Sequence, residues 1–122
     1  MQKKLVNSLA SLISGQVTDK KEFLDFYSLD SSAYSKRPRL IVFPNSVDDI
    51  KKIIRFAKKR KIPICARGGS TGLVGSSLTT GIILDMKNFN KIKLSKNHVT
   101  AGAGVSKGEL DLILKHNKKF LG

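Results

Sequence analysis

The stretch Arg67-Gly-Gly-Ser-Thr-Gly-Leu-Val-Gly-Ser-Ser77 follows directly after the apolar run Ile62-Pro-Ile-Cys-Ala66. The β-branched residues of that run predict a strand, so the glycines begin where a strand ends. Glycine has no Cβ atom, which lets the backbone adopt positive φ and approach a ligand closely. Successive N–H groups in such a turn form a concave anion site, and Ser70, Thr71 and the permanent charge of Arg67 suit phosphate. The stretch therefore predicts a loop that holds a pyrophosphate.

Two common phosphate-binding patterns do not fit this spacing. A Walker A loop ends in Gly-Lys-Ser/Thr, and no lysine stands between Arg67 and Leu84. A Rossmann fingerprint is G-x-G-x-x-G opening a helix, whereas this loop reads G-G-x-x-G-x-x-G with no clear helix after it. The stretch Gly102-Ala-Gly-Val-Ser-Lys-Gly108 comes closer, but its last interval is one residue too long. From the residues alone, a flexible structural turn remains the alternative to a ligand-binding loop.

The residues before the loop predict a βαβ unit. Leu40-Ile-Val-Phe43 is typical of a buried strand that ends at a proline, and residues 61–66 form the second strand. Between them Ser46 is a helix N-cap, and Asp49 stands three residues later, where it can close a capping box. Apolar residues then recur at helical spacing and form one stripe, namely Val47, Ile50, Ile53, Ile54 and Ala57. The two strands are expected to be parallel, with a right-handed crossover.

Further elements are expected on both sides of this unit. Residues 1–15 predict a helix that stops at Gly15, and residues 17–27 predict a second short helix or turn opened by Thr18 or Asp19. Strands are expected at 81–86 and 98–105, with a short apolar stretch at 92–94 and the start of another strand at 119–122. A capping box at 106–109 begins a helix that runs to about residue 116, with three apolar residues facing inward, namely Leu110, Ile113 and Leu114.

These elements predict an α+β (α/β) fold, in which a βαβ subdomain is followed by the start of a mixed β-sheet with flanking helices. We expect residues 1–36 to form a helical lead-in. Residues 37–122 then form the N-terminal part of a domain that the chain does not complete, because a new element begins at its last residues.

The net charge of +14 raises the question of an anionic partner such as nucleic acid. The basic residues gather on the predicted helix behind Ser46, at Lys51, Lys52, Arg55, Lys58, Lys59, Arg60 and Lys61. A solvated helix face explains them, and the aromatic residues, at 7%, are not interleaved with them as stacking platforms would be. Nucleic acid is therefore disfavoured. The single cysteine, Cys65, is expected to be a small buried packing residue.

Four ordered motifs resemble the FAD-binding module of the vanillyl-alcohol oxidase / para-cresol methylhydroxylase (PCMH) superfamily, and most closely its glycolate oxidase subunit and D-lactate dehydrogenase branch. They are Pro44-Asn-Ser-Val-Asp-Asp-Ile50, Arg67-Gly-Gly-Ser-Thr-Gly-Leu-Val-Gly75, Ile83-Leu-Asp-Met86 and Thr100-Ala-Gly-Ala-Gly-Val105. Tyr27-Ser-Leu-Asp-Ser-Ser-Ala-Tyr34 and Arg37-Pro38 also look like the lead-in of that branch. The resemblance runs from about Val17 to Gly122.

The resemblance implies a PCMH-type FAD-binding domain in which the glycine-rich loop wraps the FAD pyrophosphate, chiefly through backbone N–H groups, and the turn at 102–104 passes near the flavin. The residues implied are Arg67, Gly68, Gly69, Ser70, Thr71, Gly72, Gly75, Ser76, Gly102 and Gly104. One departure is Ser70, where the family often has a third consecutive glycine. The implied reaction oxidises a 2-hydroxy acid, glycolate or D-lactate, by moving hydride from its Cα to flavin N5.

No catalytic residue is assigned in this chain, because the resemblance places the substrate-binding and proton-abstracting residues C-terminal to it. No metal site is expected, since His98 and His116 are far apart and lack a cluster of further ligands. Asp85 after the strand is expected to cap a turn rather than act as a general base.

Three readings of function follow from the sequence. The first is the FAD-binding portion of a 2-hydroxy-acid dehydrogenase, completed by a missing C-terminal part, a complementing chain or a homo-oligomer. The second is a non-enzymatic basic module that binds nucleic acid or acidic partners, and the third is an inactive truncated remnant. A cytoplasmic location is expected, because serines interrupt any signal-type apolar run at the N-terminus and no apolar run is long enough to span a membrane.

Overall fold

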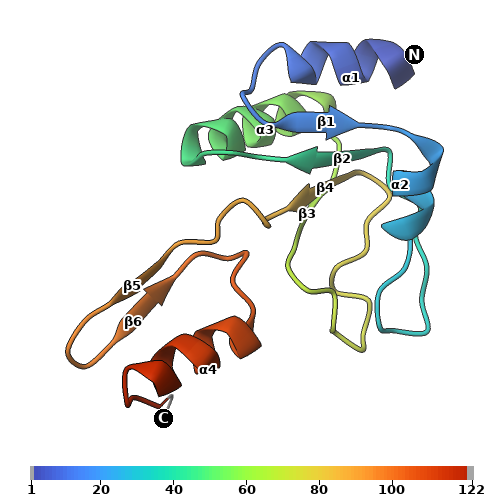
Figure 1. Ribbon diagram of the computed structural model, residues 1–122. Helices are drawn as coiled ribbons and strands as arrows, with labels where there is room; N and C mark the ends of the chain where they lie inside the picture. The colour runs from blue at the N-terminus through green and yellow to red at the C-terminus, as the bar shows by residue number, and fades with distance from the viewer. Residues whose placement is uncertain (1, 121–122) are drawn as a thin grey trace.

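The computed structural model describes residues 2–120 (Figure 1). The lead-in forms α1 (Gln2–Ala10), β1 (Gln16–Thr18) and α2 (Lys21–Phe26). The next elements are β2 (Leu40–Phe43), α3 (Val47–Arg60), β3 (Ile64–Arg67) and β4 (Ile82–Asp85). The chain then forms β5 (Ile92–Leu94), β6 (Val99–Ala101) and α4 (Lys107–His116), which lie together at one end of the molecule, away from the main sheet.

The main sheet has four strands in the order β1-β2-β4-β3. Both β2 and β3 are parallel to β4, so the prediction that the strands flanking α3 are parallel is confirmed. They are not neighbours, because β4 lies between them and pairs its Ile83 with Ile41 on one side and Cys65 on the other. The parallel strands end at the same edge, which places the loops that follow β3 and β4 side by side.

Alternate residues of the strands pack on opposite faces of this sheet. On one face Leu40, Val42, Ile82 and Leu84 join a buried cluster with residues of α1 and α3, including Leu9 and Ile53. On the other face Ile41, Phe43 and Ile83 pack against Leu24 and Tyr27 of the α2 region. The sheet is therefore covered on both faces, as is typical of parallel α/β sheets.

Helix α3 begins as predicted at Ser46, whose Oγ accepts a hydrogen bond of 3.1 Å from the N–H of Asp49. The expected capping box is only half formed. The Asp49 carboxylate instead accepts hydrogen bonds of 2.9 Å from the N–H groups of Ser14, Gly15 and Asn45. Ser14 and Gly15 of the lead-in provide more hydrogen-bond donors to this carboxylate than the single N–H of Ser46 would. The capping box at Ser106 is complete and confirms the prediction for α4.

The buried face of α3 is narrower than the predicted stripe. Ile53 and Ala57 are buried as expected, together with Phe56, but Val47 and Ile54 are 60% and 49% exposed. The seven basic residues of α3 and its C-cap are all exposed, as a solvated helix face requires. In α4, Leu114 is buried, whereas Ile113 is 37% exposed, so the expectation that it faces inward is wrong.

The lead-in differs from expectation in three places. Helix α1 ends at Ala10 and not at Gly15, which instead precedes β1 and lies so close to β2 that a Cβ there would be 2.2 Å from the carbonyl oxygen of Phe43. Part of the segment expected to be helical is β1, an edge strand antiparallel to β2. The N-cap of α2 is Lys20, without a side-chain cap, rather than Thr18 or Asp19.

The later strands are shorter than expected. β4 occupies the middle of the predicted stretch 81–86, whereas β6 occupies only the beginning of the stretch 98–105. The apolar stretch at 92–94 is β5, which pairs antiparallel with β6. Of the strand expected at 119–122, residues 119 and 120 have no regular structure, and residues 121 and 122 lie outside the described residues. Cys65 is half-buried rather than fully buried.

Candidate functional site

A cavity of about 420 Å³ lies at the carboxyl ends of β3 and β4. The glycine-rich loop supplies one wall, through Gly68, Gly69 and Thr71. The turn between β6 and α4, residues 103–107, supplies the opposite wall, and Asp85 and Lys87 lie between the two. Ligands of open α/β sheets bind outside the carboxyl ends of the strands, which is where this cavity stands. The fold thus brings together the two glycine-containing segments that the sequence singled out.

Gly68 and Gly69 leave space that the protein itself does not use. A Cβ on Gly68 would meet no atom closer than the carbonyl oxygen of Ala103 at 3.8 Å, and one on Gly69 only Thr71 Cγ2 at 3.8 Å. At Gly81, by contrast, a Cβ would lie 2.0 Å from the carbonyl oxygen of Pro63. The packing of the chain therefore requires glycine at 81 but not at 68 or 69, where a side chain would fill the cradle instead.

The remaining residues of the loop shape it from outside the cavity. Ser70 has φ +59°, and Gly75 has φ +72°, both in the left-handed region. This conformation accounts for a glycine preference at position 70, where this chain has serine. Gly72 lies against Ser76, with its Cβ position 3.0 Å from the Ser76 hydroxyl oxygen. None of these four residues lines the cavity, and their expected contact with a cofactor stays a prediction.

The two glycines after β6 have different surroundings. Gly104 lines the cavity, but a Cβ there would lie 2.2 Å from the carbonyl oxygen of Met86. Gly102 does not line it, and its Cβ position is 2.1 Å from the carbonyl oxygen of Phe89. The close approach of the turn after β4 requires both glycines, whatever the turn binds.

Arg67 turns its side chain away from the cavity. The residue is only 5% exposed, and its guanidinium donates hydrogen bonds to the carbonyl oxygens of Tyr27 (2.9 Å) and Leu29 (2.7 Å). The guanidinium also lies 4.7 Å from the centre of the Tyr27 ring. The charge thus fixes the lead-in against the end of β3, and its expected contribution to phosphate binding stays a prediction.

Residues 38–122 match the family model described as FAD binding domain. The chain belongs to the FAD binding domain family. The expected family and the expected cofactor, FAD, are thereby confirmed. A D-2-hydroxyglutarate dehydrogenase of Pseudomonas putida is 30% identical over 87% of this chain and 11% of its own length. A D-lactate dehydrogenase of Archaeoglobus fulgidus is 31% identical over 79% of this chain and 24% of its own length.

Solved structures confirm the expected fold. The structure of p-cresol methylhydroxylase with substrate bound superposes with a TM-score of 0.77 at 21% identity, covering 95% of this chain and 25% of that chain. The chain spans a quarter or less of each of these three proteins. What the described residues contain is therefore one part of an FAD-binding fold.

Charged residues line the cavity of this FAD-binding domain beside the glycines. Lys87 and Lys107 both contribute to its wall, and Lys87 lies 4.1 Å from the centre of the Phe43 ring. Asp85 caps the turn after β4, as predicted, because its carboxylate accepts a hydrogen bond of 2.9 Å from the N–H of Lys87. Its other oxygen accepts from the hydroxyl of Tyr27. Burial, followed by this hydrogen bond, raises the pKa of the Tyr27 phenol.

The N-terminus of α4 points its positive end toward the same cavity, since Ser106 and Lys107 line it. Ser106 donates from its N–H to the Glu109 carboxylate at 2.8 Å. Hydrogen bonds from Ser106 lower the pKa of Glu109. Neither Lys87 nor Lys107 was predicted from the sequence as a site residue. Lys87 could have been noticed because it follows the strand-ending acid of β4, and Lys107 because it is the first residue of a predicted helix.

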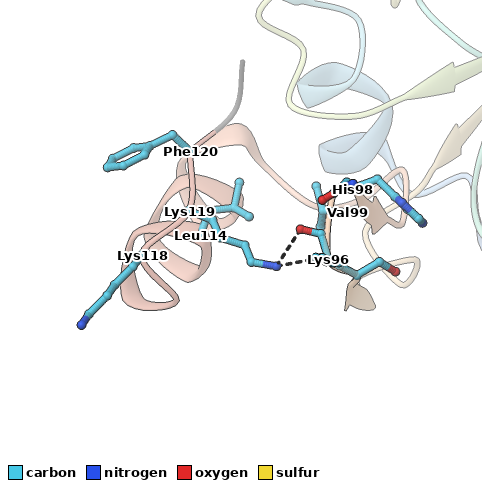
Figure 2. A pocket seen from close by; sticks show the side chains of 9 residues that line it. Lys96, His98, Val99, Leu114, Lys118, Lys119 and Phe120 are labelled. Atoms are coloured by element: carbon cyan, nitrogen blue, oxygen red, sulfur yellow. Dashed lines mark hydrogen bonds between the residues drawn. The ribbon is translucent and has the colours of Figure 1, made fainter.

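A second cavity, of about 430 Å³, lies between the β5–β6 connection and the end of α4. Figure 2 shows Lys119 reaching across it, with hydrogen bonds of 2.7 and 3.3 Å to the carbonyl oxygens of Ser95 and Lys96. The Lys119 ammonium thus connects the end of α4 to the β5–β6 connection. None of the residues expected to bind FAD lines this cavity. No helix within residues 2–120 has the length and apolar character needed to span a membrane.

Proposed function

We propose that this chain is the pyrophosphate-binding part of an FAD-dependent enzyme that oxidises a 2-hydroxy acid. The observation that carries the proposal is the cavity between the two glycine-containing segments, with unused space at Gly68 and Gly69. The relatives named D-lactate dehydrogenase and D-2-hydroxyglutarate dehydrogenase support the class of substrate. The bound FAD would accept the hydride from Cα of the hydroxy acid.

Different residues of the cavity would contact the pyrophosphate in different ways. Backbone N–H groups at Gly68, Gly69 and Thr71 form one side of the cradle, and the first turn of α4 forms the other. Lys87 and Lys107 would add positive charge beside the diphosphate, and the Lys107 ammonium is held there by the Asp111 carboxylate at 2.6 Å. The role of the chain is to bind and orient the cofactor, and no described residue is assigned to proton abstraction.

The rest of the proposed enzyme lies outside this chain. We place the hydroxy-acid site in a C-terminal part, in a complementing chain or in a second copy. Residues 1–36 act as the lead-in and residues 37–122 as the FAD-binding portion, an assignment supported by the family match that begins at residue 38. A cytoplasmic location belongs to the same proposal.

A titration followed by amide NMR tests the proposal in the purified chain. FAD and ADP carry the pyrophosphate, whereas riboflavin lacks it, so only FAD and ADP should shift the amide signals of residues 68–71 and 103–107. We expect weak binding, because the described residues surround only the pyrophosphate. Equal shifts with riboflavin, or FAD-induced shifts confined to other residues, would contradict the proposal.

Two variants sharpen this titration. Gly68→Ala puts a methyl group into the cradle, and the 3.8 Å between its Cβ position and the carbonyl oxygen of Ala103 indicates that the fold accepts it. We expect the apparent affinity for ADP to fall by about tenfold or more, equivalent to at least ~1.4 kcal/mol. Ala66→Val is the matched control, because Ala66 is exposed on β3 and does not line the cavity. It should bind ADP as the native chain does.

A further inference from the structure

The lead-in segment Tyr27–Ser31 contacts the glycine-rich loop at the start of the loop. The Arg67 guanidinium donates to the carbonyl oxygens of Tyr27 and Leu29, at 2.9 and 2.7 Å. One arginine therefore holds two carbonyl groups of the lead-in backbone through separate nitrogen atoms. Because Arg67 is the last residue of β3, this contact fixes the lead-in to the point from which the loop departs.

The same segment contacts the far end and the middle of the loop. At the far end the Ser77 hydroxyl donates to the Asp30 carboxylate at 2.8 Å, and Ser77 is only 9% exposed. In the middle the N–H of Ser31 donates to the carbonyl oxygen of Ser70 at 3.1 Å. Asp30 is itself oriented by the N–H of Ser32 at 2.8 Å. Figure 1 shows the two loops side by side beyond the ends of β3 and β4.

Beyond its contacts with the lead-in, the loop accepts one further side-chain hydrogen bond within the described residues, of 3.3 Å from Cys65 Sγ to the carbonyl oxygen of Ser76. Its tip residues Leu73 and Val74 are 75% and 78% exposed, so they contribute almost no packing. Ser70 adopts φ +59°, a conformation that a residue with a Cβ avoids without support. The hydrogen bond from Ser31 to Ser70 fixes the carbonyl of this strained residue. The contacts with the lead-in are therefore the main polar contacts that keep the loop in one conformation.

We propose that Tyr27–Ser31 is a brace that preforms the glycine-rich loop for its anionic ligand, with Arg67, Asp30 and Ser77 as positioning residues. The identity of the ligand as the FAD pyrophosphate rests on the function proposed above. A preformed loop loses less conformational freedom on binding, so the brace contributes to affinity without touching the ligand. Removing one anchor should loosen the loop and weaken binding together.

Hydrogen exchange of the amide that joins the brace to the loop tests the brace without any ligand. Ser77→Ala removes the donor to Asp30, and we expect the Ser31 amide, whose N–H donates to the carbonyl oxygen of Ser70, to exchange about tenfold faster, while amides of β2 and β4 keep their rates. Ser77→Thr keeps the hydroxyl and should restore the native rates. Ser28→Ala is the matched control. It removes a hydroxyl of the same lead-in whose 2.6 Å hydrogen bond goes to the carbonyl oxygen of Asp25 and not to the loop.

ADP affinity of the same variants tests whether the brace serves binding. We expect a several-fold loss in Ser77→Ala, recovery in Ser77→Thr and no change in Ser28→Ala. Unchanged exchange of the Ser31 amide in Ser77→Ala would overturn the brace itself. Faster exchange with unchanged ADP affinity would overturn its role in binding. If the native chain does not bind ADP, the proposed function fails, and the exchange rates still decide whether the loop is braced.

Discussion

Replacement of Asp49 by alanine should destabilise the chain strongly, because this carboxylate joins the lead-in to α3. It is 2% exposed and accepts hydrogen bonds of 2.9 Å from three backbone N–H groups, those of Ser14, Gly15 and Asn45. A fourth bond, of 3.0 Å, comes from the Ser14 hydroxyl. Few single side chains in the described structure connect as many separate segments.

The size of the effect follows from which donors water can reach. A hydrogen bond to a charged group contributes about 1.5–3 kcal/mol. Ser14 and Asn45 are exposed, so water replaces the carboxylate at their N–H groups, whereas Gly15 is half-buried. We therefore expect Asp49→Ala to lower the free energy of unfolding by about 3 kcal/mol, well below the sum of the separate bonds. With a urea m-value of about 2 kcal/mol/M, the midpoint should fall by ~1.5 M.

The contribution of Asp49 to the free energy of unfolding should depend on pH. Burial raises the pKa of Asp49, but the hydrogen bonds from Asn45, Ser14 and Gly15 outweigh it, so the folded-state pKa lies below the ordinary value of 3.8. The carboxylate therefore stabilises the fold above the ordinary pKa, and this stability is lost as the pH falls through the lower, folded-state value.

Urea titrations of the native chain, Asp49→Asn and Asp49→Ala at pH 7 and pH 3 measure this contribution. Asparagine keeps one acceptor oxygen and the size of the side chain, so its loss at pH 7 should be smaller, and the gap to the native chain should narrow at pH 3. A loss below about 0.5 kcal/mol for Asp49→Ala at pH 7, or a gap that does not change with pH, would refute the reasoning.

Three further substitutions probe individual backbone positions. Gly81→Ala should prevent normal folding, seen as lost circular dichroism, because its Cβ would lie 2.0 Å from the carbonyl oxygen of Pro63. Gly108→Ala should raise the thermal midpoint, since nothing lies within 4 Å of the new Cβ and alanine stabilises a helix by about 0.5–1 kcal/mol over glycine. Ser70→Gly should relieve the φ of +59° and raise the urea midpoint by an amount equivalent to roughly 1 kcal/mol, and an unchanged midpoint would show that the serine is not strained.

The local sequence was sufficient to predict the βαβ unit and the place of the glycine-rich loop. Both depend on interactions between residues that are close in the sequence. Runs of β-branched residues favour strands, and glycines mark the point where a strand ends. A serine begins a helix because its hydroxyl accepts a hydrogen bond from the N–H three residues later. The helix cap at Ser46 and the complete capping box at Ser106 are examples in which the residues that decide the structure are neighbours in the chain.

The features that the sequence did not predict depend on partners far along the chain. The position of β4 between β2 and β3 is a matter of strand order, which no local pattern encodes. The three residues of β1 form a strand only because β2 offers its edge. The Asp49 carboxylate does not complete the capping box with Ser46, because it accepts hydrogen bonds from the N–H groups of Ser14 and Gly15, which stand more than thirty residues earlier in the chain.

Glycine itself shows the limit of the sequence argument most clearly. Gly102 and Gly68 both stand in motifs that resemble flavin-binding segments, and composition cannot tell them apart. In the structure the backbone of Phe89 occupies the space beside Gly102, so the fold alone requires that glycine. Gly68 faces a cavity, and the nearest protein atom to its Cβ position is the carbonyl oxygen of Ala103 at 3.8 Å, so the packing of the chain does not require glycine there. Gly108 on α4 has open space as well, so what distinguishes Gly68 is its place in the cavity, where the proposed pyrophosphate cradle would explain a residue without a side chain.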